Sequence, residues 1–209
     1  MRDVRVILIG GTSNVGKSTV ARALAAELGF EYRSTDGMAR HPGRPWHTPE
    51  WRVPPHVAEH YRTLTPEELT DAVFEHYERL WPRVAELAET NAADGPGLVL
   101  EGSGVLPGRV AELTDPRVAA VWITADEDLI RARVHDASGH AAATEDERLQ
   151  VAKFLARTTL YQSRMLKTVD ALGLDRLHAG DRTPAQLTEA VLAAVAEQES
   201  PGRSRASRA

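Results

Sequence analysis

The densest group of chemically capable residues lies near the start of the chain. Gly11, Gly16, Lys17 and Ser18 match the pattern Gly-x4-Gly-Lys-Ser/Thr. Glycines at these positions let the backbone turn tightly and bring its N–H groups close to phosphate oxygens. A lysine at this spacing reaches the β- and γ-phosphates of a nucleotide, and the serine hydroxyl ligates Mg²⁺. The pattern therefore predicts binding of ATP with Mg²⁺.

The segments on either side of this loop are those that phosphate binding requires. Residues 4–9 form a nearly continuous apolar run, as expected of a central parallel strand covered on both faces. Residues 17–28 carry apolar side chains at four-residue steps, which predicts a helix ending at Gly29. The positive end of its dipole would face the bound anion. The residues expected to bind the nucleotide are Gly11, Thr12, Ser13, Asn14, Val15, Gly16, Lys17, Ser18 and Thr19.

Strands and helices alternate along the rest of the chain. Further strands are predicted at 30–34, 98–100, 118–123 and 176–179, and further helices at 65–91, 126–136, 144–172 and 184–197, the first of them kinked or restarted at Trp81 and Pro82. Five prolines and two tryptophans exclude a regular element from residues 41–55. The alternation predicts an α/β three-layer sandwich with a mainly parallel five-stranded sheet. We expect one domain over residues 1–199, with a helical insertion at 41–97 that binds the acceptor, a lid loop at 137–143 and a disordered basic tail at 200–209.

Three segments carry a resemblance to a known family: residues 9–19, the Ser34-Thr35-Asp36 sequence and residues 98–102. Together they resemble the P-loop small-molecule kinases of the 2-phosphoglycerate kinase group, which is similar to shikimate, gluconate and chloramphenicol kinases. The resemblance implies the P-loop NTPase fold and phosphate transfer from ATP to a small molecule. It also implies that the adenine lies near residues 180–183. The guanine-specific string Asn/Thr-Lys-x-Asp of GTPases is absent.

Two carboxylates follow predicted strands at the sheet edge where open α/β sheets bind ligands. In similar kinases the acid at Asp36 accepts the proton of the acceptor hydroxyl or holds a Mg²⁺-bound water. The alternative is that Asp36 caps a short helix after it. Glu101 ends a buried strand, where it would meet a Mg²⁺-bound water or pair with an arginine. The predicted metal site is Ser18, Asp36 and Glu101.

Arginines near Asp36 could grip an anionic acceptor, because a guanidinium fork suits carboxylate or phosphate. Arg40 and Arg44 are therefore expected to bind substrate together with Asp36 and Glu101. Surface arginines are also common in loops, so these two could equally be solvated. Trp46 and Trp51 could wall the acceptor pocket or anchor the loop to the core.

Arginines flank the predicted lid loop as well. Arg133 precedes it and Arg157 lies in the long helix that follows. Closing such a lid would add positive charge at the transferring phosphate and expel water. The predicted catalytic residues are accordingly Lys17, Asp36, Arg133 and Arg157. The alternative for the two lid arginines is a solvated basic helix face.

Composition excludes several other functions. The net charge is −5, and the last ten residues carry three arginines and no acid, so the remaining body is more acidic still and binds nucleic acid poorly. Without cysteine there is no disulfide, thiol nucleophile or cysteine-bound zinc. This composition and the absence of a long apolar run favour the cytoplasm and no membrane contact. Apolar residues in 66–91 could supply a homodimer face.

The sequence thus predicts an ATP-dependent phosphotransferase that moves the γ-phosphate of Mg-ATP to a hydroxyl of a small molecule. Two other functions stay open. One is a nucleotide-binding regulator or partner-dependent ATPase without a small-molecule acceptor. The other is a toxin-type kinase of a nucleotide-sugar, which shares the core motifs.

Overall fold

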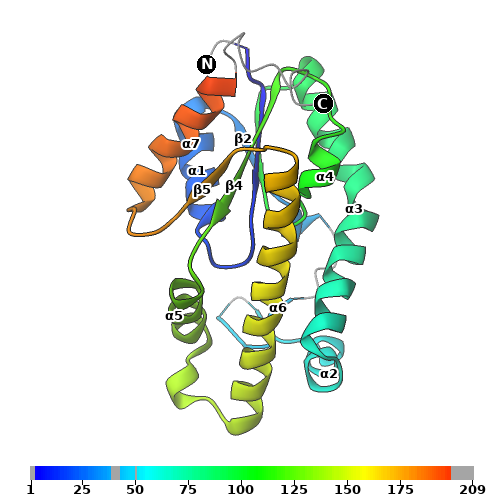
Figure 1. The fold of residues 1–209 in the computed structure, drawn as a ribbon, viewed down its shortest axis with the longest axis vertical. Helices are drawn as coiled ribbons and strands as arrows, with labels where there is room; N and C mark the ends of the chain where they lie inside the picture. The colour runs from blue at the N-terminus through cyan, green and yellow to red at the C-terminus, as the bar shows by residue number, and fades with distance from the viewer. Residues whose placement is uncertain (1–2, 39–42, 50, 199–209) are drawn as a thin grey trace.

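A computed structural model of the chain describes residues 3–38, 43–49 and 51–198. Its centre is a five-stranded sheet in the order β2-β3-β1-β4-β5 (Figure 1). Every pair of neighbouring strands is parallel. The strands are β1 (Val6–Gly10), β2 (Glu31–Ser34), β3 (Leu98–Glu101), β4 (Val118–Thr124) and β5 (Arg176–His178). The predicted α/β fold with five parallel strands is confirmed.

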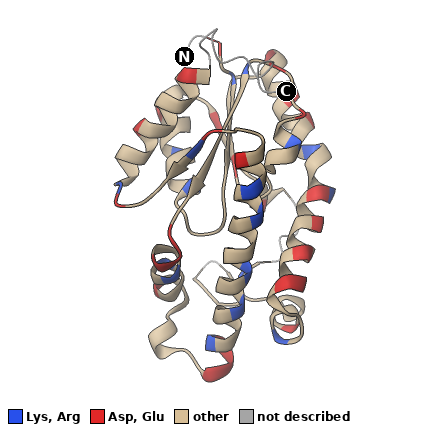
Figure 2. Ribbon diagram, in the orientation of Figure 1, with Lys and Arg blue, Asp and Glu red and all other residues tan. Residues whose placement is uncertain are grey.

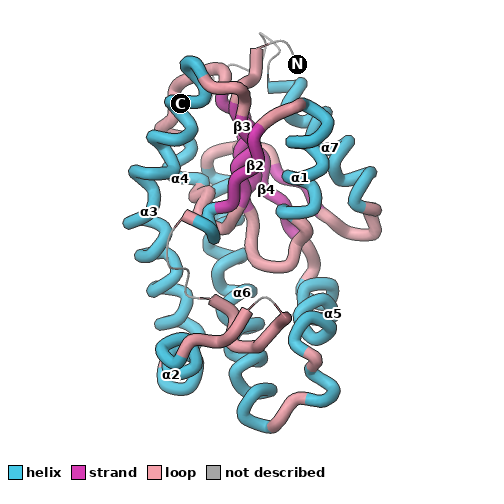
Figure 3. The backbone as a smooth tube through the Cα atoms, turned by 180° about the vertical axis from the view of Figure 1, so that it is seen from behind, coloured by secondary structure: helices cyan, strands magenta, loops and turns pink. Residues whose placement is uncertain are grey.

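Helices cover both faces of this sheet, and the central strand shows why. Ile7 and Ile9 of β1 pack into the apolar cluster on one face, whereas Val6 and Leu8 pack into the cluster on the other. Because alternate side chains of a strand point to opposite faces, a strand covered on both sides must be apolar throughout. One face is covered by α1 (Lys17–Leu28) and α7 (Pro184–Gln198), and the other by α3 (Pro66–Asp94), α4 (Pro107–Val110) and α6 (Glu145–Ala171) (Figures 1 and 3).

The two longest helices begin in the same way. Thr65 at the start of α3 and Thr144 at the start of α6 each accept a hydrogen bond from a backbone N–H, and a glutamate three residues on reaches back to the cap. Such capping boxes satisfy backbone donors that the helix itself leaves unpaired. Helix α3 runs through Pro82 without a break and ends at Asp94, so it is longer than the sequence predicted.

The segment between β2 and α3 holds a helix that the sequence did not predict. Helix α2 (Pro55–Thr63) begins with a proline in its first turn, where the missing N–H has no partner to lose. Before it, the described residues form no strand or helix except the turn η1 (Thr35–Gly37), and a single antiparallel bridge joins Thr48 to Trp51. The sequence predicted no regular element over residues 41–55, and this range is one residue too long because α2 begins at Pro55.

The predicted lid loop is mostly helical. It comprises the end of α5 (Glu127–Ser138), Gly139 in a left-handed conformation and the turn η2 (His140–Ala142). Helices α2 and α5, with the adjoining parts of α3 and α6, lie beyond the carboxyl ends of the strands (Figure 1). Across the described part of the chain, no helix has the length and apolar character needed to cross a membrane.

Candidate active site

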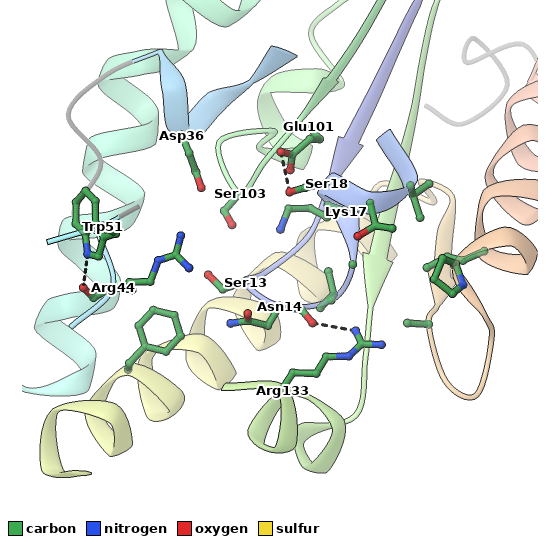
Figure 4. Close-up of a pocket in the computed structure, with 18 of the residues that line it drawn as sticks. Ser13, Asn14, Lys17, Ser18, Asp36, Arg44, Trp51, Glu101, Ser103 and Arg133 are labelled. Atoms are coloured by element: carbon green, nitrogen blue, oxygen red, sulfur yellow. Dashed lines mark hydrogen bonds between the residues drawn. The ribbon is translucent and has the colours of Figure 1, made fainter. Parts of the chain in front are cut away.

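A cavity of about 620 Å³ opens at the carboxyl ends of the strands. Its walls come from the loop after β1, the turn after β2, the segment before α2, the end of β3, and helices α5, α6 and α7 (Figure 4). Three groups of predicted residues line it. These are Ser13, Asn14, Val15, Gly16, Lys17, Ser18 and Thr19 of the phosphate loop, the carboxylates Asp36 and Glu101, and the arginines Arg44 and Arg133.

The phosphate loop has the backbone geometry that its glycines predict. Gly11 and Gly16 have φ values of 139° and 103°, in the region that side chains disfavour. A Cβ on Gly11 would also come within 2.3 Å of the Ile123 carbonyl oxygen. Gly16 precedes α1, and no side chain caps the first turn of this helix. The N-terminal N–H groups of α1 therefore have no side-chain acceptor, which fits a site for phosphate.

Lys17 is a buried cation that points into the cavity (Figure 4). Its Nζ donates a hydrogen bond of 2.5 Å to the Thr12 carbonyl oxygen. Burial lowers the pKa of Lys17, while the charges of Glu101 and Asp36 act to raise it. Because a buried ammonium needs negative charge nearby, phosphate oxygens in this cavity would favour its charged form.

Glu101 meets hydroxyl groups rather than an arginine. One of its carboxylate oxygens accepts a hydrogen bond from Ser18 Oγ at 3.0 Å and another from the Tyr32 hydroxyl at 3.0 Å. Burial and the charge of Glu101 raise the pKa of Tyr32, so this hydroxyl remains a donor. Hydroxyl and carboxylate oxygens, completed by phosphates, are the ligand types that Mg²⁺ takes. Ser18 and Glu101 therefore fit the predicted metal site.

Asp36 faces the same cavity from the other side. It lies in the turn η1. The Asp36 backbone N–H donates a hydrogen bond of 3.3 Å to the Ser34 hydroxyl. Ser34 thus caps this turn, and the Asp36 carboxylate points into the cavity instead (Figure 4). A carboxylate across from Lys17 is placed to orient a hydroxyl group between the two.

The predicted arginines have different surroundings. Arg133 lines the cavity and donates from Nη1 to the Asn14 carbonyl oxygen at 2.9 Å. Arg44 lines it from the segment before α2. Arg40 lies outside the described residues. Arg157 is 5% exposed and does not line the cavity. Its guanidinium donates to the Tyr61 hydroxyl at 2.8 Å and lies 4.3 Å from the centre of the Phe154 ring.

Two further cations of α6 contact the insertion. Lys153 Nζ donates to the carbonyl oxygens of Arg62 at 3.1 Å and Leu64 at 2.9 Å, at the end of α2. Arg164 pairs with Asp71 of α3. Both cations therefore contact a neighbouring helix or its end, although the Arg164–Asp71 pair is exposed to solvent.

Sequence reasoning left open whether the two tryptophans line the pocket or anchor the loop, and in the structure they do both. Trp46 lines the cavity and packs edge-on against Phe154 with ring centroids 4.7 Å apart. Trp51 lines it as well and donates from Nε1 to the Arg44 carbonyl oxygen at 3.1 Å. Phe154 and Ser103 were missed, because neither belongs to a motif.

No family model and no curated protein sequence matches the chain. Among solved structures, a gluconokinase from Sinorhizobium meliloti 1021 is 18% identical with a TM-score of 0.53, and the alignment covers 94% of each chain. A sugar kinase from Janibacter sp. HTCC2649 is 20% identical with a TM-score of 0.52, covering 92% of this chain and 95% of that one. The chain has the fold of the P-loop small-molecule kinases, as its motifs predicted.

Proposed function

We propose that this protein is an ATP-dependent phosphotransferase that moves the γ-phosphate of Mg-ATP to a hydroxyl group of a small molecule. One observation carries the proposal. A complete phosphate loop and the Ser18–Glu101 pair lie on one side of the cavity, and the Asp36 carboxylate points into the cavity from the other. A carboxylate that faces the phosphate loop across such a space is placed to orient an acceptor hydroxyl and take its proton.

The residues of the chain divide the work of transfer. The loop N–H groups and Lys17 hold the phosphates, and Ser18 and Glu101 hold the metal. When bound, Mg²⁺ neutralises charge on the β- and γ-phosphate oxygens. Asp36 orients the acceptor hydroxyl and takes its proton. The bond from the γ-phosphorus to the bridging oxygen breaks, a bond to the acceptor oxygen forms, and ADP leaves.

The acceptor is proposed to occupy the part of the cavity bounded by the insertion. Trp46 and Trp51 give this part an apolar wall, and Arg44 gives it a positive charge. Arg133, next to the phosphate loop and the start of α7, belongs to the nucleotide half. Helix α5 and the turn η2 are proposed to close over the nucleotide, as the lid loop was expected to do.

The test is ³¹P NMR of the purified protein with Mg-ATP and a pooled extract of small metabolites. We expect a new phosphoester resonance that grows as the γ-phosphate resonance of ATP declines. A Lys17→Ala variant in the same extract should give no such resonance. Release of ADP and free phosphate alone, at the same rate with and without the extract, would contradict the proposal and favour a regulatory ATPase. If the phosphoester forms, purifying it identifies the acceptor.

A further inference from the structure

We propose that Arg44, carried by the insertion and not by the lid, supplies the positive charge that stabilises the γ-phosphoryl group during transfer. The inference rests on the proposed function and adds a catalytic residue to it. The sequence had suggested arginines of the lid for this role and had assigned Arg44 to an anionic acceptor. The arrangement of the cations around the cavity instead favours Arg44, and not the arginines of the lid, for the transferring phosphoryl group.

Among the residues that the structure describes, four cationic side chains line the cavity, and three of them already donate a hydrogen bond to the protein. Lys17 donates to the Thr12 carbonyl oxygen, Arg133 to that of Asn14 and Arg182 to that of His178. The guanidinium of Arg44, by contrast, makes no hydrogen bond or ion pair with any residue that the structure describes. An arginine head group in a phosphate-binding cavity without a protein partner is available to a ligand.

The predicted lid loop at residues 137–143 cannot supply the missing charge. No lysine or arginine occurs between Arg133 and Arg148 in the sequence. Figure 2 shows this stretch, from the end of α5 to the start of α6, without a basic residue. Arg148 itself donates to the carbonyl oxygens of His140 at 3.3 Å and Ala141 at 3.1 Å, so its guanidinium is bound to the turn η2. Closing the stretch after Arg133 would therefore bring no new guanidinium to the phosphates, and Arg133 itself already donates to the Asn14 carbonyl oxygen.

The other candidate on α6 is held in place by packing. Arg157 is buried between the Tyr61 hydroxyl and the Phe154 ring. It lies outside the residues that line the cavity. Releasing it would leave the Tyr61 hydroxyl without its charged donor in a buried site, which is costly. Arg157 thus supports the segment that carries Arg44.

That segment fixes the backbone of Arg44 firmly. The Trp51 indole donates to the Arg44 carbonyl oxygen, and the Tyr61 hydroxyl donates to that of Gly43 at 3.4 Å. Thr48 and Trp51 exchange two backbone hydrogen bonds of 2.9 and 3.2 Å. Because this backbone is fixed, Arg44 can reach a ligand by turning its exposed side chain alone, without reorganising the segment that carries it.

The side chain of Arg44 points to the place where the phosphoryl group would be transferred. Figure 4 shows the Arg44 guanidinium pointing into the cavity, towards the gap between Asp36 and Ser13. A γ-phosphoryl group leaving the phosphate loop for a hydroxyl held by Asp36 crosses this gap. As the bond to the bridging oxygen breaks and the bond to the acceptor oxygen forms, the forked donors of Arg44 bind the phosphoryl oxygens.

The experiment needs no acceptor, because ADP with Mg²⁺ and aluminium fluoride mimics the transition state of phosphoryl transfer. Tight retention of this complex is measured for the wild type, Arg44→Ala and Arg44→Lys, beside ATP affinity and single-turnover ATP hydrolysis. Arg52→Ala is the matched control, since Arg52 is an exposed arginine of the same segment that does not line the cavity. Thermal melting of each variant checks the fold.

We expect Arg44→Ala to bind ATP within about threefold of the wild type but to lose at least about 100-fold in both retention and hydrolysis. Arg44→Lys should recover a minor part, because it restores charge without the fork, and Arg52→Ala should match the wild type. Equal retention and hydrolysis by Arg44→Ala and the wild type would overturn the role of Arg44 alone and return it to acceptor binding. A wild-type protein that neither binds ATP nor retains the complex would overturn the proposed function itself.

Discussion

The two sides of the cavity would bind their proposed ligands by different means. The phosphate side relies on the backbone: glycines at φ values of 139° and 103°, uncapped N–H groups at the start of α1 and one lysine. The insertion side relies on side chains, with an arginine and two tryptophans on a segment that has little regular structure. Backbone recognition fixes residue spacing, whereas side-chain recognition leaves the spacing free. The first is therefore visible in a sequence, and the second depends on packing between distant segments.

The largest effect on this comparison is expected from removing the lysine of the phosphate side. Lys17→Met should reduce turnover by about 10³-fold, because the β- and γ-phosphates lose a charged donor. The melting temperature should not fall, since burial lowers the pKa of Lys17 and shows that the charged form is disfavoured there. Initial rates and a thermal melt measure both. A large fall in melting temperature would mean that Lys17 holds the fold and not the ligand.

On the insertion side the corresponding prediction concerns stability. Arg157→Leu should lower the free energy of unfolding by about 2–3 kcal/mol, because the buried Tyr61 hydroxyl loses a charged hydrogen-bond donor. Affinity for ATP should be unchanged. Arg164→Leu on the same helix is the control: its pair with Asp71 is exposed, and its loss should cost about 1 kcal/mol or less. Urea unfolding compares them, and equal losses would refute a special role for Arg157.

A smaller effect is expected from the backbone of the insertion. Gly43 has a φ of 80°, and a Cβ there would lie 2.6 Å from the Trp51 ring. Gly43→Ala should cost about 1–3 kcal/mol in stability and slow transfer while leaving ATP affinity intact. Gly108→Ala has room for its Cβ and serves as the control. Weaker ATP binding in Gly43→Ala would show that the two sides are not separable.

The smallest effect concerns the helix that follows the lid. Thr144→Ala should cost about 1 kcal/mol through loss of the capping box, and hydrogen exchange should rise in the first turn of α6. Hydrogen bonds from Thr144 lower the pKa of Glu147. Its contribution to stability is therefore full above the ordinary glutamate pKa and fades as the pH falls through the lowered value. Protection factors of this turn, which remove the intrinsic pH dependence of exchange, should fall on acidification in the wild type, and unchanged protection factors would contradict the assignment.

The sequence could predict what local rules determine. Helix α1 was predicted with the boundaries it has, and the five strands were found within two residues at each end. The start of α3 was predicted from three residues: Thr65 as the cap, Pro66 at the first position and Glu68 at the third. In each case, residues close together in the chain carry the whole signal.

Contacts between distant segments could not be predicted in this way. Arg157 and Tyr61 are 96 residues apart in the chain, and spacing along α6 gave no sign that the guanidinium is buried against α2. Helix α2 was not predicted, because its first residue, Pro55, was counted with the prolines of the irregular segment before it. A proline is also a common first residue of a helix. Tyr32, which shares the Glu101 oxygen with Ser18, belongs to no motif and became visible only in the structure.

In the proposed function, the cavity binds ATP on one side and orients a hydroxyl acceptor on the other. Asp36→Asn tests it most directly, with ATP affinity measured beside transfer of labelled γ-phosphate from ATP to a metabolite extract. We predict an ATP affinity within about threefold of the wild type and a transfer rate reduced by about 10²–10⁴-fold, because the hydroxyl loses its proton acceptor. Transfer at the wild-type rate by Asp36→Asn would contradict the claim.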